Sequence, residues 1–176
     1  MRRAIARANR SRRGKIRIVH FSVQTDHLHL LVEADNRTAL VEGLRGLCIR
    51  IARNVNQLLS RRGRFFADRW HGRALTSPRQ VRNALVYVLA NFRKHQPYAH
   101  PGVDPYSSAP YSKDFIEFPR GALAAGFHHP LAPPNGPASV VAQTWLLSKG
   151  WQRHGKLSWS ERPATGSDHS SAAHPT

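Results

Sequence analysis

The pattern of apolar and polar residues near the N-terminus predicts two β-strands. Residues 16–23 are rich in β-branched and aromatic side chains, and residues 27–34 have a similar character, which favours a strand in each segment. Thr25 and Asp26 lie between them and are typical of a turn. We therefore expect the two strands to pair as an antiparallel hairpin.

Helical periodicity predicts a short helix before this hairpin and a long one after it. Residues 2–13 are rich in alanine and arginine, and Gly14 suits the end of a helix. Residues 35–38 offer caps for a helix that reaches about Arg62, with Gly63 as its C′ residue. The apolar residues of the long helix recur at steps of three and four and form one stripe, namely Leu40, Leu44, Leu47, Ile51, Val55 and Leu58.

A third helix has the clearest start signal in the chain. Residues 77–80 read Ser-Pro-Arg-Gln, which supplies an N-cap, a proline at the first helical position and a glutamine at the capping-box position. The helix that they open is predicted to reach about Lys94. Before it, residues 64–75 are predicted to be a strand or otherwise extended.

The composition divides the chain into three regions. Residues 1–95 are predicted to form the main domain. Residues 96–159 form an irregular, Pro-rich extension that ends in a short element around Trp145 and Trp151. From residue 160 to 176 the chain consists mostly of Ser, Ala, His, Pro and Thr, and we expect a disordered tail.

The positive charge of the chain is concentrated in the first region. Residues 1–95 hold 21 basic and 5 acidic residues, whereas residues 96–176 hold 6 and 5. Of the 27 basic residues, 22 are arginines, whose planar guanidinium groups pair with phosphates and stack on bases. This favours nucleic acid as the partner; the competing interpretation is a basic, solvated surface.

Several classes of protein are excluded by what the sequence lacks. Cys48 is the one cysteine among 176 residues, which excludes a disulfide-stapled fold and a zinc site built mainly on thiolates. No apolar run is long enough for a transmembrane helix, and the N-terminus has no apolar segment typical of a secretory signal. We expect a cytoplasmic protein without a membrane partner.

Two histidines are expected side by side on the second predicted strand. Side chains alternate across a strand, so His27, His29, Leu31 and Glu33 share one face. The aliphatic residues between them share the other face, which should pack on helices. The two imidazoles either bind one metal ion or phosphate, or are hydrogen-bonded at the sheet surface, which is commoner for so short a pattern.

Tyr87 is expected on the polar side of the third helix, with Asn91 one turn after it. The apolar stripe of that helix consists of Val81, Leu85, Val88, Leu89 and Phe92. Tyr87 is either a boundary residue with its hydroxyl in water or a nucleophile beside an amide that binds metal or phosphate. Tyr98, Tyr106 and Tyr111 lie in Pro-rich or irregular stretches, so their positions are less well defined.

The order and spacing of these features resemble the HUH single-tyrosine transposases, of the insertion-sequence or REP-associated type. The segments that carry the resemblance are residues 26–33, the basic helix after them, residues 63–70, and Tyr87 with Asn91. In the HUH motif, U stands for a hydrophobic residue between two histidines, and in this chain that residue is Leu28. The resemblance covers roughly residues 2–95 and implies a ferredoxin-like α+β fold, in which helices back an antiparallel sheet.

The resemblance also implies metal-dependent chemistry on single-stranded or hairpin DNA. His27 and His29 would ligate Mg²⁺ or Mn²⁺, with Asn91 as the polar third ligand. Tyr87 would attack the scissile phosphate and form a 5′-phosphotyrosine, which leaves a 3′-OH and permits rejoining without ATP. The implied setting is DNA transposition and recombination at the bacterial nucleoid, by a monomer or a homodimer.

The phosphate contacts of such an enzyme are assigned to arginines of the basic segment. These are Arg45, Arg50, Arg53, Arg61, Arg62 and Arg64. Phe66 and Trp70 are candidates for stacking on bases, and equally for the core.

Two differences separate the sequence from the family pattern. Family members usually begin with a strand ahead of the position of Arg2, so we expect the edge beside the histidine strand to lack a partner. Many relatives have proline after the position of Asn91, where this chain has Phe92. Two functions stay open: an active DNA nicking and strand-transfer enzyme, and a catalytically inactive, truncated nucleic-acid-binding remnant.

Overall fold

The computed structural model describes residues 1–11, 16–90, 104, 106–115, 138–158 and 160–163. Asn91, Phe92 and Tyr98, together with the part of the expected tail from residue 164 onward, lie outside these ranges. In the described part of the chain, no helix is both long and apolar enough to cross a membrane.

The described elements form an α+β fold, as the sequence predicts. In chain order they are α1 (Arg2–Asn9), β1 (Ile16–Val23), β2 (Leu28–Ala34), α2 (Arg37–Leu58), α3 (Pro78–Ala90), η1 (Ala109–Tyr111), α5 (Trp145–Ser148) and η2 (Gly150–His154). The two strands pair antiparallel, with Ile16 opposite Ala34 and Val23 opposite Leu28, and a bulge interrupts the register between Ile18 and His20. The predicted hairpin is therefore confirmed.

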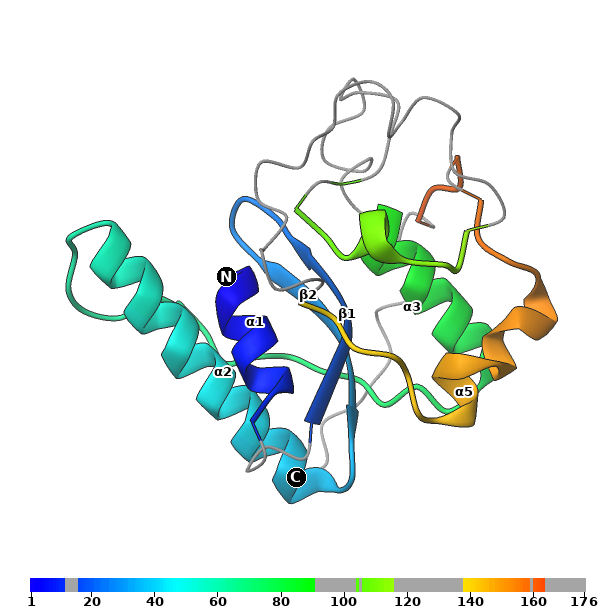
Figure 1. Ribbon diagram of the computed structural model, residues 1–176, viewed down its shortest axis with the longest axis horizontal. Coiled ribbons are helices and arrows are strands. Elements are labelled where there is room, and N and C mark those ends of the chain that lie inside the picture. Colours follow the sequence, from blue (N-terminus) through cyan, green and yellow to red (C-terminus); the bar gives the residue numbers. More distant parts are fainter. Residues whose placement is uncertain (12–15, 91–103, 105, 116–137, 159, 164–176) are drawn as a thin grey trace, which may run out of the picture.

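Helices pack on both faces of the hairpin, with α1 and α2 on one face and α3 on the other (Figure 1). The first core lies between the sheet and α1 with α2, and contains Ile5, Phe21 and Ile51. The second core lies on the α3 side and contains Leu31 and Leu85. Because each face of the sheet is covered, the alternating residues of β2 enter different cores.

The edges of the hairpin differ in what they pair with. At β1, the Val23 amide donates to the Tyr106 carbonyl at 3.0 Å, and the Ser108 amide donates to the Phe21 carbonyl at 2.9 Å. At β2, the sheet within the described residues has no strand other than β1 as a neighbour.

Helix α2 begins where the sequence predicts but ends earlier. The Asn36 side chain caps its start by accepting from the Ala39 amide at 2.8 Å. The helix ends at Leu58, and Ser60, not Gly63, takes the left-handed C′ conformation, with φ of 50°. The Ser60 amide donates to Gln57 and the Arg61 amide to Asn56, which is the Schellman pattern. The prediction of a helix up to Arg62 is therefore wrong, because the Schellman hydrogen bonds end the helix before it reaches Gly63.

Helix α3 is capped as predicted, with one variation. Ser77 Oγ accepts from the Gln80 amide at 3.3 Å. Gln80 Oε1 accepts from the Thr76 amide at 2.8 Å, one residue before the usual target of a capping box. Residues 64–75, predicted to be a strand or extended, form no strand and are irregular.

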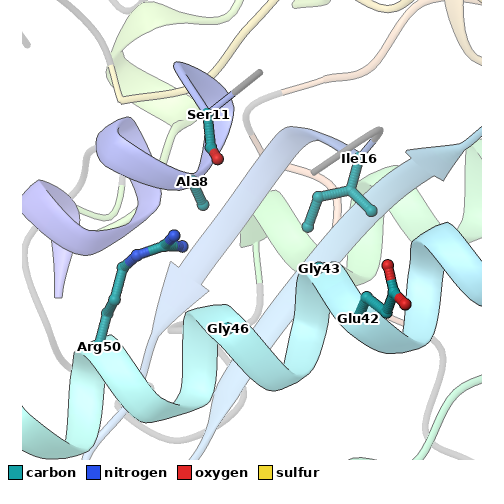
Figure 2. A pocket seen from close by; sticks show the side chains of 7 residues that line it. All are labelled: Ala8, Ser11, Ile16, Glu42, Gly43, Gly46 and Arg50. Atoms are coloured by element: carbon teal, nitrogen blue, oxygen red, sulfur yellow. The ribbon is translucent and has the colours of Figure 1, made fainter. Parts of the chain in front are cut away.

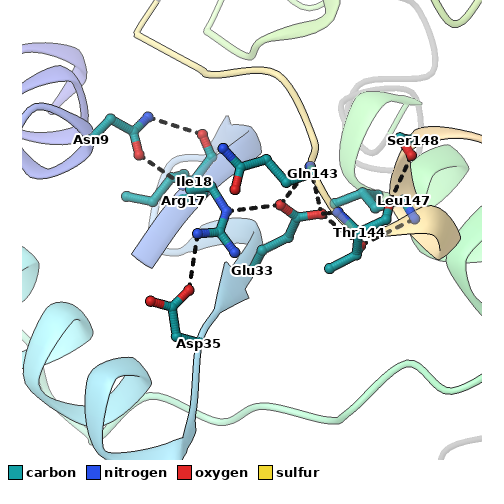
Figure 3. A network of polar contacts seen from close by, with 9 residues as sticks. All are labelled: Asn9, Arg17, Ile18, Glu33, Asp35, Gln143, Thr144, Leu147 and Ser148. Atoms are coloured by element: carbon teal, nitrogen blue, oxygen red, sulfur yellow. Dashed lines mark hydrogen bonds and ion pairs between the residues drawn. The ribbon is translucent and has the colours of Figure 1, made fainter. Parts of the chain in front are cut away.

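A buried carboxylate ties residues 138–148 to the sheet (Figure 3). Glu33 accepts from Arg17 Nε at 3.1 Å, from the Gln143 amide at 2.9 Å, and from Thr144 through its amide at 2.8 Å and its hydroxyl at 2.6 Å. Asn9 Nδ2 adds a bond to the Ala138 carbonyl at 2.8 Å. This segment therefore lies against the sheet through bonds to residues more than 100 positions away.

Residues 145–158 and 160–161 continue along α3. Trp151 is 1% exposed and packs in the second core. On α3, Arg82 donates to the Gly155 carbonyl at 3.0 Å and to both carboxylate oxygens of Glu161, at 2.7 and 3.0 Å. Packed chain thus extends past residue 160, where the sequence predicts a disordered tail to begin.

We predict that Glu33→Gln destabilises the protein by about 2–3 kcal/mol, because charge-assisted hydrogen bonds to a buried acceptor are lost. Burial alone would raise the pKa of the Glu33 carboxyl, but the bonds from Thr144, Gln143 and Arg17 outweigh it and hold the pKa below its ordinary 4.5. A lowered folded pKa means that the stabilisation is complete above pH 4.5 and is lost as pH falls through the folded pKa.

Urea unfolding at pH 7 and at pH 3.5 measures both parts of this prediction. Glu42→Gln is the matched control, because Glu42 is an exposed carboxylate of α2. An equal pH dependence in the wild type and in Glu33→Gln would contradict the role of the Glu33 carboxylate.

Candidate active site

The two histidines lie at the start of β2, on the face that α3 covers. His27 comes directly before the strand and His29 is its second residue. Their ring centroids are 4.5 Å apart, with the ring planes at 73°. The predicted alternation is confirmed, since Leu28, Leu30 and Val32 pack on the first core, whereas Leu31 is buried in the second.

Tyr87 comes from α3 and meets this histidine pair. Its ring centroid lies 4.8 Å from that of His29, with the planes at 75°. Four residues of the predicted stripe, Val81, Leu85, Val88 and Leu89, are buried, which fixes the rotation of the helix. Tyr87 itself is partly buried. The fold therefore brings together three residues that the sequence singles out from segments 58 positions apart.

Asp26, predicted only as part of the turn between the strands, contacts the first histidine. Its Oδ1 atom lies 2.5 Å from His27 Nδ1. When Nδ1 carries the proton and donates it to this carboxylate, Nε2 is the ring nitrogen of His27 that carries the lone pair. The signal for this role was present in the sequence, because a carboxylate stands directly before the first histidine.

The histidine pair fits part of a ligand set for a divalent transition metal. Imidazole nitrogens suit such ions, whereas Mg²⁺ and Mn²⁺ prefer oxygen ligands, so either of these two ions would need oxygen ligands in addition to the histidine pair. Asn91, the expected third ligand, lies outside the described residues. Among the residues whose positions are described, no three or more His, Cys, Asp and Glu side chains gather as a metal site. Asn91, substrate oxygens or water could supply further ligands.

The predicted DNA-contacting arginines lie on α2 and the loop after it, on the other side of the sheet from α3 (Figure 1). Arg45 and Arg53 are exposed on the helix, and Arg61, Arg62 and Arg64 are exposed in the loop. Helix α2 runs antiparallel to β2 and diverges from the hairpin toward its C-terminal end (Figure 1). DNA that contacts both the arginines and Tyr87 must therefore pass around the hairpin.

Arg50 has a different environment from the other arginines (Figure 2). Its side chain lines a hollow of about 160 Å³ between α1 and α2, together with Ser11 and Glu42. Helix α2 approaches the sheet closely here, since a Cβ on Gly43 would lie 2.6 Å from the Ile16 side chain. Arg50 is therefore less available to a phosphate than Arg45 or Arg53.

The two aromatic candidates for base stacking are placed differently. Phe66 packs partly against the first core, in edge contact with Phe65 at 4.8 Å between centroids. Trp70 is 44% exposed. Of the two, Trp70 is accessible to a base and Phe66 is mainly a core residue.

Comparison of the chain with protein-family models, with curated proteins and with solved structures finds no match in any of the three. The functional conclusion therefore depends on the residues of the site and on the resemblance of their motifs.

Proposed function

We propose that this protein is a metal-dependent transposase-like enzyme that cuts and rejoins single-stranded or hairpin DNA through Tyr87. The observation that carries the proposal is the contact of His27, His29 and Tyr87, which come from two elements and meet on one face of the sheet. A phenol beside two imidazoles combines a nucleophile with groups able to bind a cation. That combination suits attack on a phosphodiester.

In the proposed reaction, Tyr87 Oη attacks the phosphorus and becomes bonded to the phosphate at the new 5′ end. The bond between phosphorus and the 3′ oxygen breaks, the phenolic proton passes to water, and the 3′ oxygen takes a proton from water and leaves as a hydroxyl. The reverse attack by a 3′-OH releases Tyr87 and rejoins the strand without ATP. A divalent ion on His27 and His29, with Asn91 as a further ligand, would supply positive charge next to the phosphate.

The scaffold supports this chemistry by fixing the partners before DNA arrives. His29 is held by strand pairing, since the hairpin places it opposite Ser22. Tyr87 is held by a helix whose buried residues lock its rotation. Asp26 orients His27. Groups held in place in this way lose little entropy when the substrate binds.

The basic residues of the segment 1–95 would bind the phosphates of DNA. Residues 1–95 carry a net charge of +16 from 21 basic and 5 acidic residues. Neutralised phosphates release counterions, so binding should weaken steeply with salt. We place such a protein with the bacterial chromosome, acting as a monomer or a homodimer.

A second function, nucleic-acid binding without catalysis, is favoured by one observation. Five of the six candidate arginines are exposed on α2 or the loop after it, whereas Tyr87 lies on α3, on the other side of the sheet. Binding through those arginines therefore needs none of the three residues of the candidate site.

A covalent-trapping assay separates the two functions. Purified protein is mixed with labelled hairpin DNA from the flanking genome, with Mn²⁺ or with a chelator, and adducts are resolved on a denaturing gel. The enzyme predicts a protein–DNA adduct that requires the metal ion. If the protein binds the same hairpins but forms no adduct under either condition, catalysis is contradicted and nucleic-acid binding without catalysis is supported.

We predict that His29→Ala lowers adduct formation on the order of 100-fold, because a missing ligand removes electrostatic stabilisation of the transition state. The variant should also bind Mn²⁺ more weakly in calorimetry without DNA, a readout independent of activity. His71→Ala is the matched control, since His71 is an exposed histidine of the loop before α3. Equal Mn²⁺ binding by His29→Ala and wild type would contradict the assignment of His29 as a ligand.

A further inference from the structure

The end of α2 presents two leucines to solvent. Leu58 is 81% exposed and Leu59 is 59% exposed, although the same helix is fully buried at Ile51. The C-terminal end of α2 projects away from the hairpin and the other helices (Figure 1). We call residues 58–64 the α2 tip. Its leucines continue the apolar stripe of the helix past the point where the first core ends.

The conformation of the α2 tip is fixed by its own hydrogen bonds. The Schellman pattern closes the helix at Ser60. Asn56 Nδ2 donates to the Gly63 carbonyl at 2.8 Å, Arg61 Nη2 donates to the Arg64 carbonyl at 3.1 Å, and Arg64 Nε donates to the Phe66 carbonyl at 2.7 Å. The two leucines are therefore presented on a preorganised turn, which lowers the entropy cost of inserting them into a partner.

The charge around the α2 tip selects the partner. Residues 43–67 contain six arginines and no acidic residue, and Arg61, Arg62 and Arg64 are exposed beside the leucines. A second copy would bring the same positive charge against itself. A nucleic-acid stem is complementary, because it offers phosphates to the arginines and stacked bases to the leucines. Leucine is one of the side chains that proteins insert between base steps from the minor groove.

We propose that the α2 tip is a wedge that inserts Leu58 and Leu59 into the stem of a DNA hairpin, while Arg61 and Arg62 hold the flanking phosphates. Insertion unstacks one base step and kinks the stem. This deepens the proposed function, on which the choice of DNA rests. It also assigns substrate recognition to the face of the molecule opposite Tyr87, so that the stem and the cleaved strand are held at different places.

The test uses hairpins that each carry 2-aminopurine at one stem position, because this base brightens when it is unstacked. The protein is Tyr87→Phe with a chelator present, so that no cleavage occurs. The wedge predicts brightening at one position. The double variant Leu58→Ala/Leu59→Ala should lose the brightening and bind roughly tenfold more weakly or worse, since burial of each leucine side chain is lost.

Two further variants separate the wedge from the phosphate contacts. Arg61→Ala/Arg62→Ala should keep the brightening at saturation, but the slope of log K against log salt should decrease by about two, one for each lost phosphate. Val41→Ala is the matched control: its side chain is 41% exposed at the other end of α2, and both measurements should be unchanged.

Three results would overturn the wedge. They are tight hairpin binding with no bright position, undiminished brightening in the leucine double variant, and displacement of the hairpin by anionic phospholipid vesicles that bind wild type but not the double variant. The trapping assay is independent of this one. An adduct without brightening removes only the wedge, whereas brightening without an adduct from wild type removes only the proposed catalysis.

Discussion

A Tyr87→Phe variant is expected to form no covalent adduct with DNA under conditions in which the wild type does. The substitution removes the only atom that the proposed reaction uses as nucleophile, so the loss should be complete. The ring is retained, so its edge contact with His29 at 4.8 Å between centroids is preserved. Folding and hairpin affinity should therefore match those of the wild type, and only the chemical step should be lost.

The measurement is the denaturing-gel trapping assay with Mn²⁺, accompanied by urea unfolding and by hairpin binding. Tyr106→Phe and Tyr111→Phe are the matched controls, because these tyrosines are 57% and 37% exposed on the segment beside β1. Both controls should retain the adduct. An adduct that persists in Tyr87→Phe would support the enzymatic function but contradict the assignment of Tyr87 as the nucleophile. Loss of the adduct in Tyr106→Phe or Tyr111→Phe would then identify the nucleophile.

The local part of the site could be predicted from the sequence because it depends on short-range geometry. Alternation along β2 is enough to place His27 and His29 on one face, and the apolar stripe of α3 is enough to place Tyr87 outside it. The contact between the histidine face of β2 and the Tyr87 side of α3 depends on tertiary packing, which local patterns do not predict. The resemblance to the HUH family indicated a tyrosine helix beside the histidine strand, but it did not indicate that helices cover both faces of the hairpin, with α3 on the side of the histidines.

Long-range polar contacts were not predictable in the same way. Glu33 was assigned to the histidine face, but its partners Gln143 and Thr144 lie 110 and 111 positions away. No periodic pattern in the sequence predicts hydrogen bonds between residues so far apart. The C-terminal end of α2 was misjudged for a related reason: Gly63 offered a glycine at C′, whereas the carbonyls of Asn56 and Gln57 were already satisfied by Arg61 and Ser60.

Trp151→Ala is expected to destabilise the protein by about 3–5 kcal/mol, the usual range for truncating a buried tryptophan. Trp151 is 1% exposed and belongs to the same core as Leu85 and Leu89 of α3. The sequence predicted only a short element around Trp145 and Trp151. In the structure this element packs against the helix that carries Tyr87, so a segment outside residues 1–95 contributes to the position of the proposed nucleophile.

Urea unfolding of wild type, Trp151→Ala and Trp151→Phe measures this effect, and Trp151→Phe should give an intermediate loss even if the alanine variant fails to fold. Trp145→Ala is the matched control. Trp145 is 49% exposed, with the Arg153 guanidinium over its ring at 4.8 Å, and its removal should cost less than about 1 kcal/mol. Equal losses of stability from Trp145→Ala and Trp151→Ala would contradict the role of Trp151 as the support of α3.

Because a displaced helix misplaces its tyrosine, Trp151→Phe should also lower adduct formation under conditions in which it is fully folded.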